Sequence, residues 1–209
     1  MSDPAPAHSE SPSPRLHVVP TPPRKPQPHE DSRVGGSFIQ STLSAAFVSL
    51  AGVWLAVLQI VLFLSLQLLL SSAFVTYVVV VACWLAGAAI GVWIPRGPWS
   101  FALMVLSGLT PYASLALLAA APYDTSLVLV HGGFVLVTAL YAGQLFQQER
   151  QSFARVATLF FYENTGFVLG LVLGVVGFVL LGRGFLQAAP AVGLVTVALV
   201  AALRRAAAS

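Results

Sequence analysis

A short polar cluster interrupts the fifth long apolar run of the sequence. Glu163 lies there with Tyr162, Asn164 and Thr165 around it, about seven residues after the run begins, or roughly 10 Å along a helix. A carboxylate in hydrocarbon is costly unless it is protonated, paired or solvated. The cluster therefore indicates either part of a path for an ion or a cationic substrate, or a hydrogen-bonded contact that joins two helices.

Two more polar side chains lie inside apolar runs. Gln59 is near the middle of the first run, where an amide needs a partner on another helix, so we expect it to bond two helices together. A place for Gln59 in a polar network or ligand site stays open. His131 lies near one end of the fourth run, too far in depth from Glu163 to share a simple site, and no metal-ligand set surrounds it.

The sequence carries no pattern that would make this chain an enzyme. We find neither an H-E-x-x-H run nor a serine and histidine with a supporting acid. Because Cys83 is the only cysteine, neither an intrachain disulfide nor a cysteine-based metal cluster can form. We therefore predict a protein without catalytic residues, without a cofactor and without a metal.

Glycines recur at four-residue spacing in two of the apolar runs. This spacing places small residues on one helix face, where they let a second backbone approach closely. Packing between helices is a commoner reason for such glycines than contact with a ligand, so we predict two helix-packing seams. Their residues are Gly87 and Gly91 in the second run, and Gly166, Gly170, Gly174 and Gly177 in the fifth.

The composition indicates that these runs are membrane helices. Hydrophobic residues make up 57% of the 209 residues and charged residues only 8%, a balance that a water-soluble surface cannot use. Each run is long enough to cross a hydrocarbon layer of about 30 Å. We predict an all-α, polytopic transmembrane domain over residues 37–205, with six helices near 43–70, 73–94, 99–120, 127–146, 156–181 and 185–203.

Residues 1–36 form a polar segment rich in proline, serine and histidine, which we predict to be a disordered tail. Such a composition buries too little apolar surface to offset the entropy of ordering. The run from Pro20 to Pro28 permits a polyproline II ligand for an aromatic groove, but a plain linker is the commoner role.

The positive charges favour one orientation in the bilayer. With six crossings and a cytoplasmic N-terminus, only Arg183 falls on the outer side, as the positive-inside rule requires. Both termini are therefore expected in the cytoplasm. The net charge of +3 gives no single basic stripe, so we expect the bilayer as a partner and no nucleic acid. The cytoplasmic residues would be Arg15, Arg24, Lys25, Arg33, Arg96, Arg150, Arg155, Arg204 and Arg205.

Several stretches together carry a family resemblance. They are Leu58-Gln59-Ile60, Ser71-Ser72-Ala73-Phe74, the stretch from Trp84 to Gly91, and Phe161 to Gly166 with Gly170. In these places the chain resembles the membrane domain of bacterial spermidine synthase-like fusion proteins. That domain has a first helix with a glutamate at mid-membrane, a Gly-Ser-Ser-type turn, a helix ending in Gly-x-x-x-Gly, and a later segment in which tyrosine, asparagine and threonine precede glycines at four-residue spacing.

The chain departs from this family in two respects. Gln59 stands where the family would have its glutamate, and the sequence contains no strand followed by a Gly-x-Gly turn and an acid, which the soluble aminopropyltransferase domain would supply. The resemblance therefore implies a bacterial inner-membrane location without the enzymatic activity.

We expect a non-catalytic membrane module that binds a partner protein or a small cationic ligand. The alternative is a small transporter of polyamines, protons or other cations that works as a homo-oligomer. Glu163 and the glycines of the fifth run motivate this alternative.

Overall fold

The structure is a computed structural model that describes residues 30–70, 73–95, 97, 99–122 and 124–208. Within them the chain forms helices and no strand, so the predicted all-α fold is confirmed. The six long helices are apolar enough to span a membrane, which makes this a multi-pass helical membrane protein. They are α1 (Glu30–Leu70), α2 (Ala73–Val92), α3 (Trp99–Ala120), α4 (Val128–Glu149), α5 (Val156–Leu181) and α6 (Arg183–Ala208), with short 3₁₀ turns η1 (Thr125–Leu127) and η2 (Arg150–Ser152).

The helix α1 begins earlier than the sequence suggested. It starts at Glu30, so residues 30–36 belong to the helix rather than to the tail. The rest of the predicted tail, including the proline run, lies outside the described residues.

Two short turns connect helices at the same end of the bundle. Gly182 joins α5 to α6 by itself, with φ of +56°, a left-handed conformation that favours glycine. Between α3 and η1, the Asp124 carboxylate accepts hydrogen bonds from the hydroxyl (2.6 Å) and the amide (3.0 Å) of Ser126. These bonds stabilise the charged form and lower the pKa of Asp124.

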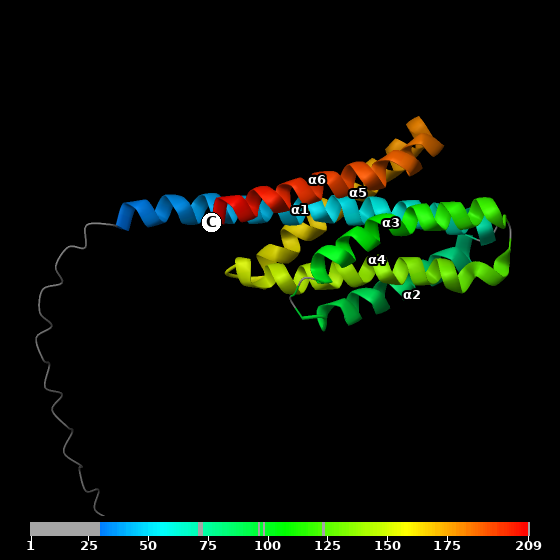
Figure 1. The fold of residues 1–209 in the computed structure, drawn as a ribbon, viewed down its shortest axis with the longest axis horizontal. Coiled ribbons are helices and arrows are strands. Elements are labelled where there is room, and N and C mark those ends of the chain that lie inside the picture. The colour runs from blue at the N-terminus through cyan, green and yellow to red at the C-terminus, as the bar shows by residue number, and fades with distance from the viewer. Residues whose placement is uncertain (1–29, 71–72, 96, 98, 123, 209) are drawn as a thin grey trace, which may run out of the picture.

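The first helix is the centre of the bundle. α1 packs against each of the other five long helices, and Figure 1 shows it running through the middle, with the end of α6 beside its first half. In its most apolar stretch 61% of the residues are buried, compared with 17% in α5 and 17% in α6. The outer helices thus present most of their aliphatic side chains to the surroundings, as lipid solvation requires.

The fifth helix crosses the bundle obliquely and packs along α1 through glycines (Figure 1). A Cβ atom added at Gly166 would meet the Ser49 backbone, and one at Gly170 would meet the Val53 backbone. The remaining predicted glycines lie as follows: Gly174 faces the Ile60 side chain, Gly177 faces Phe185 of α6, and on α2 Gly87 and Gly91 lie against the Leu136 and Leu140 carbonyls of α4.

A single tryptophan fills the middle of the bundle. The Trp54 indole is 2% exposed and meets the Tyr141 ring edge to face, with 5.8 Å between ring centroids. Gly108 of α3 and Gly193 of α6 make room for it, because a Cβ at either position would contact the indole. Trp54 of α1 therefore contacts α3, α4 and α6 at the same level along the bundle axis.

Candidate functional site

The polar cluster of α5 lies on the edge of the α1–α5 seam. Glu163 is half-buried, and its backbone carbonyl lies against Gly52 of α1. Its carboxylate has no hydrogen-bond or ion-pair partner among the described residues. Asn164 and Thr165, which follow it, are exposed. The cluster thus offers a carboxylate, an amide and a hydroxyl at the surface of a membrane helix.

Tyr162 turns toward the start of α5 instead. Its ring packs near Phe153 and Phe161, with centroids 6.2 Å and 5.6 Å away, and its carbonyl accepts a hydrogen bond from the Ser49 hydroxyl at 3.2 Å. These contacts fix the first turns of α5 on α1. Tyr162 therefore positions the backbone next to Glu163.

The structure does not bring Gln59 to the Glu163 cluster. Gln59 lies seven residues beyond Gly52 on α1, which is about 10 Å further along the helix. Its amide oxygen is buried and accepts no hydrogen bond from the described residues. Of the four candidate residues, Tyr162, Glu163 and Asn164 thus lie together on α5, and the Gln59 amide lies apart from them on α1.

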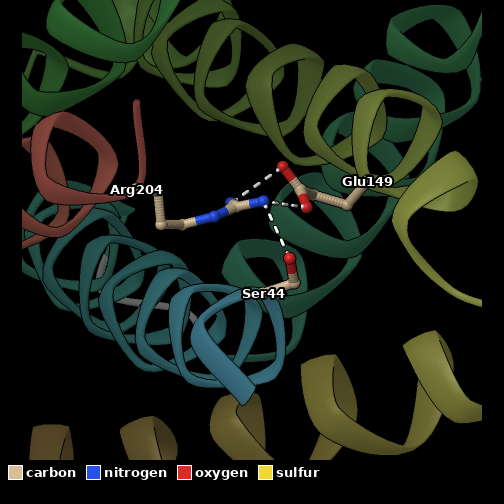
Figure 2. Close-up of polar contacts among 3 residues, drawn as sticks. All are labelled: Ser44, Glu149 and Arg204. Atoms are coloured by element: carbon tan, nitrogen blue, oxygen red, sulfur yellow. Dashed lines mark hydrogen bonds and ion pairs between the residues drawn. The ribbon is translucent and has the colours of Figure 1, made fainter. Parts of the chain in front are cut away.

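A partly buried ion pair at one end of the bundle was not foreseen from the sequence. The Arg204 guanidinium donates to both oxygens of the Glu149 carboxylate, at 3.0 Å and 2.9 Å, and to the Ser44 hydroxyl at 3.1 Å (Figure 2). It also lies over the Phe47 ring, 4.5 Å from its centroid. These contacts join α1, α4 and α6, so we assign the group to stability rather than to ligand binding.

A serine and a histidine also come together, although no sequence pattern predicts their contact. Ser114 of α3 and His131 of α4 lie with the Oγ and Nδ1 atoms 2.8 Å apart, and both side chains are 0% exposed. This burial keeps a substrate away from the pair. No group of three histidine, cysteine, aspartate or glutamate side chains among the described residues is arranged to hold a metal ion.

The helix α6 contains Pro190, which lacks the amide hydrogen that other residues supply to the helical ladder. The Tyr112 hydroxyl inserts at this point, donating to the Gln187 carbonyl at 2.7 Å and accepting from the Ala191 amide at 3.1 Å. The Trp54 indole donates to the Pro190 carbonyl at 3.1 Å. Side chains of α1 and α3 thus form hydrogen bonds with backbone groups of α6 around the proline.

Replacing Tyr112 by phenylalanine should cost about 1 kcal/mol of unfolding free energy, because both backbone groups lose their shared partner. Unfolding in mixed detergent micelles, followed by circular dichroism, measures this change. Tyr77→Phe is the control, since Tyr77 is 59% exposed and its hydroxyl forms no hydrogen bond with the described residues. Equal stability of Tyr112→Phe and wild type would mean that the direct Ala191 to Gln187 bond reforms without loss.

In comparisons with known proteins, no family model, no curated protein and no solved structure matches the chain.

Proposed function

We propose that this chain is a non-catalytic module of a bacterial inner membrane which binds a cationic group at Glu163. Both termini face the cytoplasm in this proposal, because nine of the ten basic residues then lie on the inner side. The resemblance to the membrane domain of spermidine synthase-like fusions supports the location and makes a polyamine the first ligand to try.

The single observation that carries the proposal is the state of the Glu163 carboxylate. It lies about 10 Å along α5 from the helix start, half-buried beside α1, without a partner among the described residues. Arg204 bonds both oxygens of Glu149, so that acid is already neutralised. A cation from outside the chain is one way to stabilise a membrane carboxylate that lacks such a partner, beside protonation and hydration.

The neighbours of Glu163 suit an ammonium group. The Asn164 side chain follows Glu163 on the helix, is exposed and carries an oxygen that accepts hydrogen bonds. An ammonium at the Glu163 carboxylate can donate to both groups. A small polyamine and a basic side chain of a partner helix share this chemistry.

The test is binding of labelled spermidine to the full chain in nanodiscs, with Glu163→Gln as the variant and Asp124→Asn as the control. Asp124 is an exposed acid in the turn before η1, so its loss changes net charge equally without touching α5. We expect at least a tenfold weaker Kd for Glu163→Gln, which corresponds to about 1.4 kcal/mol, and an unchanged Kd for Asp124→Asn. Wild-type binding that both variants retain, or no saturable binding at all, contradicts the proposal.

A homo-oligomeric transporter is the second candidate, favoured by the open outer faces of α5 and α6, where only 17% of the residues are buried. Flux of polyamines, protons or simple cations into liposomes, present in the wild type and lost in Glu163→Gln, distinguishes it from a binding module. Background flux in both proteins removes this candidate.

A further inference from the structure

The interface between α3 and α4 carries polar side chains that neither proposed function uses. On α3 these residues are three and then four positions apart, and on α4 they are seven positions apart, so each set lies on one helix face. All are at most 4% exposed. They are Ser107, Thr110 and Ser114 of α3, and His131 and Thr138 of α4.

Three of the four hydroxyls are satisfied inside their own helix. Ser107 donates to the Leu103 carbonyl at 2.8 Å, and Thr110 lies 2.8 Å from the Ser107 carbonyl. Thr138 lies 3.0 Å from the Phe134 carbonyl and 2.7 Å from the Thr110 hydroxyl. This bonding to the preceding turn is how serine and threonine ordinarily enter membrane helices.

Ser114 differs from these residues. Its hydroxyl lies 2.8 Å from His131 Nδ1, and no carbonyl among the described residues takes its hydrogen. If Ser114 donates to Nδ1, the imidazole carries its hydrogen on Nε2, and only that N–H lacks a partner. If Nδ1 donates instead, both the hydroxyl hydrogen and the Nε2 lone pair lack one. The first arrangement leaves fewer unsatisfied groups and is therefore favoured.

The unpartnered atom is the Nε2 of His131, whose side chain is 0% exposed. We propose that His131 Nε2 donates to one bound water molecule, so that Ser114 and His131 form an internal hydration site between α3 and α4. Buried polar atoms that lack a protein partner are characteristically bound to water. Water is the acceptor that fits, because the ring is enclosed by the bundle.

The position of His131 gives water a short route. His131 is the fourth residue of α4, only about 5 Å along the helix from its start. A water molecule that enters from this membrane surface therefore has little depth to cross before it reaches the ring.

The experiment is solid-state NMR of the full chain in liposomes with ¹⁵N-labelled histidine. The chain has four histidines, so the spectrum of His131→Phe identifies the His131 signals by their loss. We expect a protonated Nε2, an unprotonated Nδ1, and magnetisation transfer from water to the Nε2 hydrogen. A protonated Nδ1, or an Nε2 hydrogen that receives transfer from lipid or protein but not from water, overturns the proposal.

A pair of serine variants tests the Ser114 contact separately. Ser114→Ala should shift His131 from one tautomer to a mixture, because nothing then donates to Nδ1. Ser107→Ala is the matched control, since the Ser107 hydroxyl bonds Leu103 of its own helix. If the His131 signals are the same in both variants, Ser114 does not set the tautomer and the site is wrong as described. Should Ser114→Ala fail to fold, the water transfer in the wild-type chain decides alone.

Discussion

Glu149→Gln should lower the unfolding free energy by about 3 kcal/mol or more, one of the two largest losses that we expect from a single substitution. Glu149 and Arg204 are 11% and 20% exposed, so little water reaches either charge. The amide keeps one oxygen that can accept from the guanidinium but carries no charge, so the cation would be left with neutral contacts, among them Ser44 and the Phe47 ring. A buried charge without its counter-ion is among the most destabilising features a fold can carry.

The double variant Glu149→Met with Arg204→Met separates loss of pairing from loss of packing. Removing both charges leaves no buried ion, so this variant should be distinctly more stable than Glu149→Gln alone. Arg205→Gln is the control, because Arg205 is exposed, and its effect should stay within about 0.5 kcal/mol. Unfolding by SDS in mixed micelles provides the comparison. If the three variants unfold at the same SDS concentration as the wild type, the ion pair is too well hydrated to contribute to the unfolding free energy.

Gly166→Ala should loosen α5 from α1 at a cost of about 1–3 kcal/mol, the usual range for an overpacked contact. The added methyl group would lie against the backbone of Ser49, which cannot rotate away as a side chain can. The two helices must therefore separate along their length. Because only 17% of the most apolar stretch of α5 is buried, this separation should also raise its protease sensitivity and hydrogen exchange.

Gly133→Ala is a control of the same chemistry on another helix. A Cβ there meets nothing within 4 Å, and alanine is the better helix former by up to about 1 kcal/mol. The same glycine-to-alanine change should thus be neutral or stabilising at Gly133 and destabilising at Gly166. Equal effects at the two positions would show that helix propensity, rather than close approach of backbones, governs the seam.

The sequence predicted the helices well where a turn or a charge marks their ends. The helices predicted over 99–120 and 156–181 have those bounds in the structure, and α5 ends where Gly182 makes the turn. The sixth helix is longer than predicted, from Arg183 to Ala208. One glycine suffices for the turn before it, and the alanines after Leu203 favour continued helix despite their low hydropathy.

The contacts between helices were harder to predict, because they depend on which helix ends meet. Hydropathy treats Glu149 and Arg204 as loop charges, although their side chains join 55 positions apart in the sequence. The same holds for Trp54, since only the packed bundle shows that Gly108 and Gly193 surround its indole. Glu163 was predictable because a lone acid in an apolar run is visible without any tertiary contact.

The central place of α1 has a consequence for how this protein is assembled. In chain order α1 enters the bilayer before the five helices that later cover it, and the acceptor for its Trp54 indole is a carbonyl in α6. During synthesis, the residues of α1 that are buried in the finished bundle therefore contact lipids or insertion factors until the later helices are inserted. The helix that is inserted first becomes fully enclosed last, so mutations in its core should show first as failures of biogenesis.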